Sequence, residues 1–211
     1  MDDATRQRLQ AYLDELARWN QRLNLTRVAP EHAWDKHVEE VLDLLGACPP
    51  AEGTRAVDVG AGGGVPGIPM AILRRDMHVS LLESDRRKAG FLTHVAGALQ
   101  LDNVAVLVER AEDLARRPQA RESFDLAVSR AVAPPPVMCE LALPLVRVGG
   151  MVAALVTDAG RAARECGHAA QLCGGGEPRA ATGGVLLVAK ERATPEEYPR
   201  RAGVPLRRPL V

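Results

Sequence analysis

Three glycines separated by single residues, Gly60, Gly62 and Gly64, follow a short apolar run that contains Asp58. Glycine tolerates positive φ and lets the backbone approach a bound molecule without a Cβ in the way. The amphipathic pattern that begins near Ile68 predicts a helix, whose first unpaired N–H groups would face the same loop. Strand, glycine turn and helix together predict a loop that binds a nucleotide-like cofactor, with Asp58 placed to orient it.

The spacing of the loop excludes the dinucleotide fingerprint, because the sixth position counted from Gly60 is Val65 and not glycine or alanine. A second apolar run, residues 78 to 83, ends in Glu83 about twenty residues further on, where an acid accepts hydrogen bonds from ribose hydroxyls. Loop and acid together resemble the S-adenosylmethionine site of Rossmann-like methyltransferases. The alternative is a tight strand-to-helix turn without a ligand.

Two further strand ends carry residues that suit such a cofactor. Glu112 can accept from an adenine amine and the backbone at Ala111 can donate to the ring, although acids at a helix N-terminus need no ligand to be favourable. Arg130 follows the fourth apolar run, where a guanidinium can bind a methionine carboxylate or a substrate phosphate. We expect Arg130 to be the catalytic residue; a surface ion pair is the alternative.

Several signatures of other methyl-transfer chemistries do not occur in this sequence. The fourth strand is followed by Ser-Arg-Ala and not by the [DN]-P-P-[YFW] run typical of enzymes that methylate exocyclic amines, and no cysteine has the setting of a pyrimidine-carbon nucleophile. A substrate with its own lone pair, such as a ring nitrogen, then needs only in-line approach to the methyl group. The histidines are too scattered for a metal site and are expected at surfaces or helix ends: His32, His37, His78, His94 and His168.

Apolar runs alternate with helical patterns from residue 53 onward, which predicts an α/β fold with a mostly parallel, doubly wound, Rossmann-like sheet. The predicted strands are 55–59, 78–83, 103–108, 124–129, 150–156 and 184–189. The predicted helices are about 67–75, 86–100, 134–146 and 158–170.

Residues 1–50 predict an N-terminal helical extension of two amphipathic helices that pack on each other, either as a lid over a substrate or as a cap on the sheet. Residues 51–191 form the predicted methyltransferase-like domain. Residues 192–211 are rich in arginine and proline, so we expect a surface tail that contacts phosphates and adds little to the fold. Arg74-Arg75 and Arg86-Arg87-Lys88 extend this expected phosphate-binding rim, unless they are ordinary solvated charges.

The composition limits the possible partners. Lys+Arg and Asp+Glu are both 27, so no overall field attracts nucleic acid and any RNA contact must be local. Aromatic residues make up only 3%, which disfavours binding of single strands by base stacking. No apolar run approaches the roughly 20 residues needed to span a bilayer. We expect a cytoplasmic monomer with reduced cysteines, without a membrane segment or a metal.

The sequence resembles the bacterial 16S ribosomal RNA guanine-N7 methyltransferase G family, also called glucose-inhibited division protein B. The likeness covers nearly the whole chain. It rests on R-W-N-Q-R-L-N-L-T at 18–26, His37, D-V-G-A-G-G-G-V-P-G-I-P at 58–69, L-L-E-S at 81–84, Lys88, F-L at 91–92, R-A-E at 110–112 and S-R-A-V-A-P at 129–134. It implies S-adenosylmethionine contacts at Gly60, Val65, Ala111 and Glu112, Arg130 in the active site, and a guanine in 16S rRNA or a small-subunit particle as substrate.

The sequence departs from the family pattern at two places. Ala154-Leu155-Val156-Thr157 stands where the family usually has a Leu-Lys-Gly run, and Gly183-Gly184 stands where it often has Arg-His. Both departures remove a cation, so they bear on the RNA contacts more than on the cofactor site. Two alternatives remain open at this level: a small-molecule methyltransferase, and a non-catalytic module that binds the cofactor or RNA.

Overall fold

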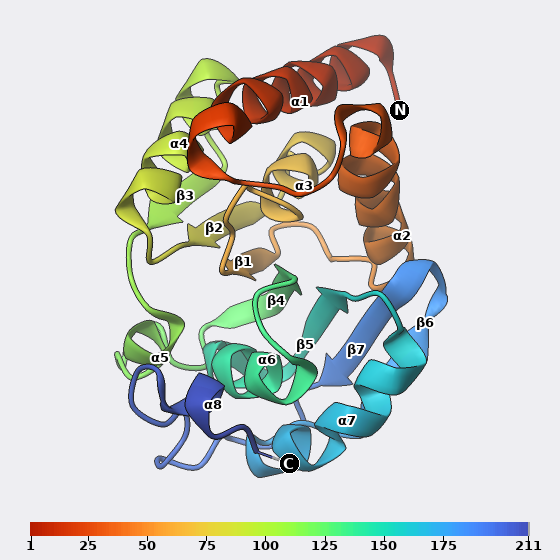
Figure 1. Ribbon diagram of the computed structural model, residues 1–211. Helices are drawn as coiled ribbons and strands as arrows, with labels where there is room; N and C mark the ends of the chain where they lie inside the picture. Colours follow the sequence, from red (N-terminus) through yellow and green to blue (C-terminus); the bar gives the residue numbers. More distant parts are fainter. Residues whose placement is uncertain (211) are drawn as a thin grey trace.

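A seven-stranded sheet with the order β3-β2-β1-β4-β5-β7-β6 runs through the centre of the molecule (Figure 1). The computed structural model describes residues 1–210. The strands are β1 Arg55–Val59, β2 His78–Leu82, β3 Val104–Leu107, β4 Phe124–Arg130, β5 Val146–Leu155, β6 Arg179–Ala181 and β7 Val185–Ala189. The first five pair in parallel and β7 pairs antiparallel with β5 and β6. The predicted Rossmann-like α/β fold is confirmed.

The central strands are buried on both faces, which is why they read as continuous apolar runs instead of alternating ones. Along β1, Ala56 belongs to the core on one side of the sheet, while Val57 and Val59 belong to the core on the other. Figure 1 shows the two layers: α1, α2, α3 and α4 on one face, α5, α6 and α7 on the other. Two separate hydrophobic cores therefore fix the sheet from both sides.

The first helix, α1 (Asp3–Leu23), packs mainly on α3 (Gly67–Leu73) and α4 (Arg86–Ala98) through a stripe that includes Leu9, Leu13 and Leu16. The sequence-based expectation that it packs on the next helix is wrong. That next helix, α2 (Glu40–Ala47), lies instead against β5, β7 and the β6–β7 turn. Both helices thus cap the sheet. The segment 24–34, called the strap below, leads from α1 toward α2 and passes the carboxyl ends of β1 and β4.

Three helices cover the opposite face: α5 (Ala111–Leu114), α6 (Pro135–Ala142) and α7 (Ala159–Leu172). The edge strand β6, which lies between the glycine run at 174–176 and β7, was not predicted. Its three residues are exposed or half-buried, so they lack the apolar pattern that marks a strand in sequence. Short 3₁₀ turns lie at Pro30–His32, Leu143–Leu145 and Thr182–Gly184.

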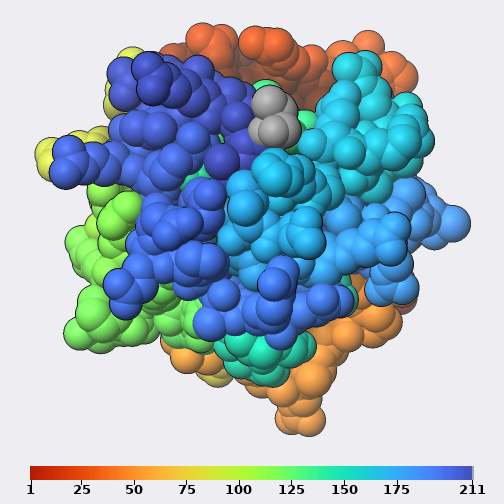
Figure 2. Space-filling view, turned by 90° about the horizontal axis from the view of Figure 1, so that it is seen from below, coloured from red at the N-terminus to blue at the C-terminus, as the bar shows by residue number. Residues whose placement is uncertain are grey.

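The C-terminal tail lies flat against the domain and ends in a short helix, α8 (Val204–Arg207). Figure 2 shows it in dark blue, spread across one face beside the α7 region. Arg121 donates to the carbonyls of Thr194 and Tyr198, and the guanidinium of Arg200 pairs with the fully buried carboxylate of Glu140 at 2.6 Å. The expectation that the tail adds little to the fold is contradicted by these contacts.

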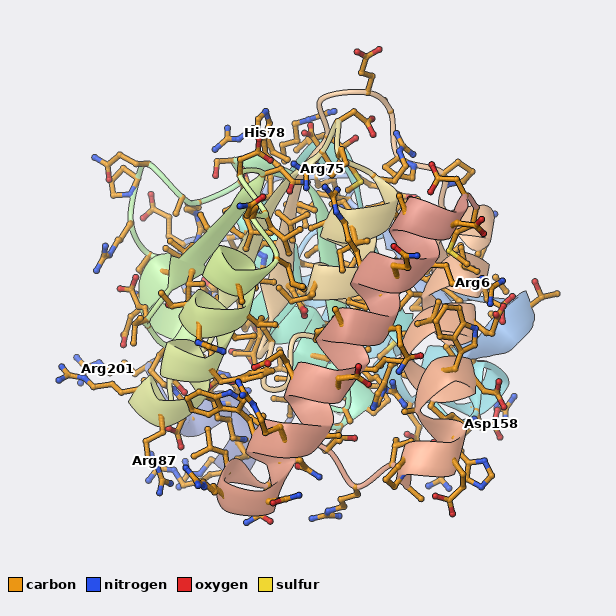
Figure 3. All side chains as sticks on the ribbon, turned by 90° about the horizontal axis from the view of Figure 1, so that it is seen from above. Arg6, Arg75, His78, Arg87, Asp158 and Arg201 are labelled. Atoms are coloured by element: carbon orange, nitrogen blue, oxygen red, sulfur yellow. The ribbon has the colours of Figure 1, made fainter. Side chains whose placement is uncertain are left out.

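The order of the strands in the sheet reverses between the parallel neighbours β1 and β4. The strands β2 and β3 lie on one side of β1, whereas β5 follows β4 on the other side. In such sheets ligands bind outside the carboxyl ends of the strands at this switch point. Figure 3 places Arg75 and His78 at one end of the molecule, and Arg87, Arg201 and Asp158 toward the other. Arg75, which pairs with Asp102, therefore lies away from the site, and its neighbour Arg74 pairs with Asp76.

Candidate cofactor and substrate site

The glycine loop after β1 bends tightly because three of its residues have positive φ: 72° at Gly60, 53° at Gly62 and 88° at Gly64. The N–H groups of Gly60 and Ala61 both donate to the carbonyl of Leu82, at 2.9 and 3.0 Å. These bonds hold the loop against the end of the neighbouring strand β2. A Cβ at Gly60 would overlap the side chain of Val132, so this position requires glycine for packing as well as for φ.

Glu83, at the end of β2, is 8% exposed and accepts from the loop. One carboxylate oxygen accepts from the Gly62 N–H at 2.9 Å, and the other accepts from the Asp85 N–H at 2.7 Å. Each carboxylate oxygen has a further lone pair. Since Glu83 also lines the pocket, it fixes the loop and still offers acceptors to a bound molecule.

Asp58 and Gly64 lie behind the loop and not in the pocket lining, unlike Gly60, Gly62 and Val65. Asp58 is fully buried, and one of its oxygens accepts from the Gly67 N–H at 2.9 Å, at the first residue of α3. Burial raises the pKa of Asp58 to about 7. The sequence-based expectation that Asp58 orients the loop agrees with this bond, whereas direct cofactor contact by Asp58 or Gly64 has no support in this geometry.

The end of β3 brings Ala111 and Glu112 to the same pocket. Glu112 is 2% exposed, and one of its oxygens accepts from Arg110 at 3.0 Å and from the Gly203 N–H at 2.9 Å. Burial opposes the charged form, but these hydrogen bonds outweigh it and lower the pKa of Glu112. A residue of the tail is thus bound directly to a predicted cofactor residue.

The resulting pocket has a volume of about 660 Å³ and is lined by all of the predicted site residues except Asp58 and Gly64. Apolar walls from Leu82, Val137 and Leu141 face the carboxylates of Glu83 and Glu112. Pro205 and Leu206 of the tail close one side. Volume and lining are typical of a site for a nucleoside-sized ligand, with an apolar slot for a base and a few polar groups to orient it.

Arg130, the last residue of β4, lies where this pocket meets a second hollow of about 1180 Å³, and it lines both. Its guanidinium is turned toward the N-terminal extension. It donates to the carbonyl of Lys36 and, at 2.8 Å, to Nδ1 of His37, and it pairs with Glu40 at 3.3 Å. The predicted catalytic residue is therefore in the site and is held there by helical residues far away in sequence.

The second hollow contains the positions at which this sequence departs from the family pattern. Val156, Gly183 and Gly184 line it, between α2 and the end of β5. Gly183 and Gly184 have φ values of 69° and 71°, and a Cβ at Gly183 would overlap Asp43 of α2. The turn packs so closely on α2 that a larger residue at position 183 would require the Asp43 side chain or the turn itself to shift.

Sequence reasoning missed several residues of the N-terminal extension that reach the site. Tyr12 donates from its hydroxyl to the Gly63 carbonyl at 2.7 Å, which ties α1 to the glycine loop. His37, expected at a surface, is 2% exposed and bonded to Arg130. The apolar pattern of α1 includes Tyr12 but does not show its long-range partner, and only the resemblance marked His37. No group of three or more histidine, cysteine or acidic residues suited to a metal occurs within residues 1–210.

Lowering the pH should destabilise the fold through His37. Its pKa is lowered from 6.5 to about 4, mainly by burial and then by the nearby Arg130 cation. Between these values the unfolded chain binds a proton that the folded chain does not. The free energy of unfolding therefore falls as the pH falls through this window, by up to about 3 kcal/mol. His37→Asn removes this contribution. In denaturant titrations, the free energy of unfolding of His37→Asn should therefore rise relative to that of wild type as the pH is lowered. A difference between the two proteins that does not depend on pH would refute the expectation.

Deleting residues 203–211 should weaken the affinity for S-adenosylmethionine about tenfold, because the truncation removes the Pro205–Leu206 wall and the N–H donor of Gly203 to Glu112. Calorimetric titration of the cofactor measures the effect. The double substitution Arg207→Ala and Arg208→Ala is the matched control, because it removes charge from the same segment and keeps the wall. Equal affinity of the truncated and full chains would show that the wall does not contribute.

Known proteins resemble this chain over most of its length. The family model described as GidB, rRNA small subunit methyltransferase G, matches residues 5–177. A ribosomal RNA small subunit methyltransferase G from Moorella thermoacetica is 38% identical over 213 residues, covering 96% of this chain and 89% of the relative. The relative of the same name from Roseiflexus castenholzii is 36% identical, covering 95% and 89%.

Solved structures share the fold at lower identity. A Corynebacterium glutamicum protein is 17% identical with a TM-score of 0.56, covering 86% of this chain and 90% of its own. A T. thermophilus 16S rRNA N2 methyltransferase, solved in complex with AdoMet and guanosine, is 23% identical with a TM-score of 0.50, covering 74% of this chain and 40% of its own. From the sequence matches, with the fold and the pocket at the switch point in agreement, we conclude that this chain belongs to the rRNA small subunit methyltransferase G family.

Proposed function

We propose that this protein transfers a methyl group from S-adenosylmethionine to N7 of a guanine in 16S ribosomal RNA. The observation that carries the proposal is the junction of two hollows at Arg130, Ala131, Val132 and Ala133, at the carboxyl ends of the central strands. One hollow has the size and lining of a nucleoside site. The other is larger and lies directly beside it, so a base could approach a methyl group held at the junction.

The residues of the smaller pocket fit S-adenosylmethionine. Glu83 is placed to accept from ribose hydroxyls while it holds the loop through Gly62. The buried carboxylate of Glu112 and the backbone at Ala111 lie at the end of β3, where an adenine ring would find an acceptor and a donor. Gly60 and Val65 complete the loop side of the pocket.

The chemistry requires orientation more than proton transfer. S-adenosylmethionine supplies a methyl group that is already activated by a sulfonium, and guanine N7 already carries a lone pair. The protein therefore has no proton to remove before the displacement and gains most from holding the two groups in line. The planar fork of Arg130 can bind the O6 and N7 edge of guanine or a phosphate beside it.

Contacts with RNA phosphates have to be local, because the formal net charge is zero. Arg27 and Lys36 are exposed at the second hollow, and Lys88 borders the cofactor pocket. Arg87 and Arg201 lie toward the same end in Figure 3. These cations, and not Arg74 and Arg75, form the proposed phosphate-binding rim. We further expect a cytoplasmic monomer; within residues 1–210 no helix is long and apolar enough to cross a membrane.

Transfer of tritiated methyl groups to cellular RNA tests the proposal. Purified protein is incubated with labelled S-adenosylmethionine and either naked 16S rRNA or small-subunit particles from cells lacking the modification, and the RNA is digested to nucleosides. Label in 7-methylguanosine is the expected result. Label only in small molecules of a cell extract would favour a small-molecule methyltransferase, and cofactor binding without transfer would favour a non-catalytic module.

A further inference from the structure

The guanidinium of Arg130 is held by one short segment of the N-terminal extension. Residues Asp35–Glu39 form a single π-helical turn that leads directly into α2. π-turns inside helices are frequent at functional sites because they redirect side chains and carbonyls. Here the turn presents the Lys36 carbonyl and Nδ1 of His37 to one nitrogen of Arg130, and Glu40, the first residue of α2, pairs with the other.

These bonds leave part of the guanidinium free. The two N–H groups of Nη1 are used by Lys36 and His37, and one N–H of Nη2 faces Glu40. A guanidinium has five N–H donors. Nε–H and the second N–H of Nη2 have no hydrogen-bond partner among residues 1–210, so they remain available to a ligand between the two hollows.

The orientation of His37 is itself fixed from the other side of the ring. Nδ1 accepts from Arg130, so the ring proton resides on Nε2, which lies 3.3 Å from Oγ1 of Thr26. Thr26 is held in turn by Asn20, whose amide bonds both the N–H and the carbonyl of Thr26 at 2.9 Å. A hydrogen-bonded chain thus runs from the C-terminal end of α1 through the strap to the end of β4.

We propose that His37 is a positioning residue that fixes the Arg130 guanidinium at the junction of the two hollows, with Thr26 and Asn20 fixing the His37 ring. The proposal rests on the function proposed above, in which Arg130 orients the substrate. A long arginine side chain loses roughly 2 kcal/mol of rotamer entropy when it is ordered. Because the histidine orders the Arg130 side chain in the folded protein, this entropy is lost on folding and not when the substrate binds.

Other roles for His37 do not fit its surroundings. It has no acidic, cysteine or histidine partners that would form a metal site within the described residues. It is not available as a general base, because the lone pair of Nδ1 is occupied by Arg130 and the reaction has no proton to remove. Simple packing would make no use of the two nitrogens.

Two substitutions separate these nitrogens. Asparagine places its amide oxygen near the position of Nδ1, so His37→Asn keeps the acceptor for Arg130 and loses the bond to Thr26. Glutamine places its amide near Nε2, so His37→Gln keeps a partner for Thr26 and loses the acceptor for Arg130. We expect kcat for methylation of 16S rRNA to fall about tenfold or more in His37→Gln and to stay within about threefold of wild type in His37→Asn. His78→Gln, at the far end of the molecule (Figure 3), is the matched control.

A double-mutant cycle with Arg130→Ala tests whether His37 acts through Arg130. If it does, His37→Gln lowers kcat in the wild-type background and changes it little when Arg130 is already absent. Equal losses in both backgrounds, or equal losses in His37→Asn and His37→Gln, would overturn the proposal. Thermal unfolding of each variant, with the Kd of S-adenosylmethionine, separates loss of kcat from loss of the fold or of cofactor binding.

A readout that does not depend on activity distinguishes failure of this proposal from failure of the proposed function. In spectra of protein with ¹⁵N-labelled arginine, the guanidinium N–H signals of Arg130 should be protected from exchange in wild type and His37→Asn, and broadened in His37→Gln. If these signals behave as expected but 16S rRNA is not methylated, only the proposed function is wrong. If Arg130 is equally ordered in all three proteins, the positioning role of His37 is wrong even when the RNA is methylated.

Discussion

Glu83→Ala should weaken the affinity for S-adenosylmethionine by about tenfold to a hundredfold, which corresponds to the loss of one hydrogen-bonded buried charge. Two effects of the Glu83 carboxylate explain the expected loss of affinity. The carboxylate is placed to accept from the ribose, and it also fixes the glycine loop by accepting from the N–H groups of Gly62 and Asp85. Removing it frees the loop and leaves the Gly62 N–H without its acceptor.

Calorimetry with S-adenosylmethionine and S-adenosylhomocysteine measures this effect. Glu83→Gln keeps one amide oxygen and the shape of the side chain, so its affinity should lie between those of wild type and Glu83→Ala. Glu52→Ala, an exposed residue in the turn before β1, is the control for a lost negative charge. Unchanged affinity in Glu83→Ala would remove Glu83 from the cofactor site, and tight binding of NADH by wild type would indicate a different cofactor class.

Arg130→Lys should lower the turnover of RNA methylation about tenfold to a hundredfold while the affinity for S-adenosylmethionine stays near that of wild type. Lysine keeps the positive charge but lacks the planar fork, so it cannot hold the π-turn at 35–39 and a substrate at the same time. Arg130 uses Nη1 on Lys36 and His37 and one N–H of Nη2 on Glu40, which leaves Nε–H and the second N–H of Nη2 for a ligand at the junction of the two hollows.

The two roles open to Arg130 predict different kinetics. If its free donors orient the guanine or a phosphate, kcat falls in Arg130→Lys and the Kd of the cofactor does not change. If they anchor the methionine carboxylate, the Kd rises first. Arg147→Lys, which makes the same change in an ion pair with Asp125 at the start of β4, is the matched control. Full methylation by both Arg130→Lys and Arg130→Ala would show that Arg130 has no catalytic role and would point to a different substrate.

Much of the fold was predictable because its signals are local. The apolar runs of β1 and β2 differ in period from the helices that follow them, and glycine at positions 60 and 62 is required by positive φ in a turn of few residues. In a parallel sheet, the ends of such strands meet at one edge. Glu83, Glu112 and Arg130 could therefore be assigned to one site from their positions after successive apolar runs, without knowledge of any side-chain contact.

The N-terminal extension shows where local signals end. Periodicity identifies α1 as amphipathic, but an apolar stripe packs on any complementary surface. Its actual partners, α3 and α4, are determined by the completed sheet. The same holds for His37, which looks like an ordinary surface residue until the π-turn places it against a strand end 93 positions away.

The sequence predicts a surface tail that contacts phosphates and adds little to the fold, because its prolines and arginines resist regular structure. Only the tertiary structure supplies the buried partner of Arg200, Glu140, and the acceptor for Gly203, Glu112. The sequence alone therefore determined the backbone geometry of the cofactor loop and the class of the sheet, since these depend on residue type and short-range spacing. Which side chains complete the site, and which arginines face it, depended on contacts between segments far apart in the chain, which carry no short-range pattern.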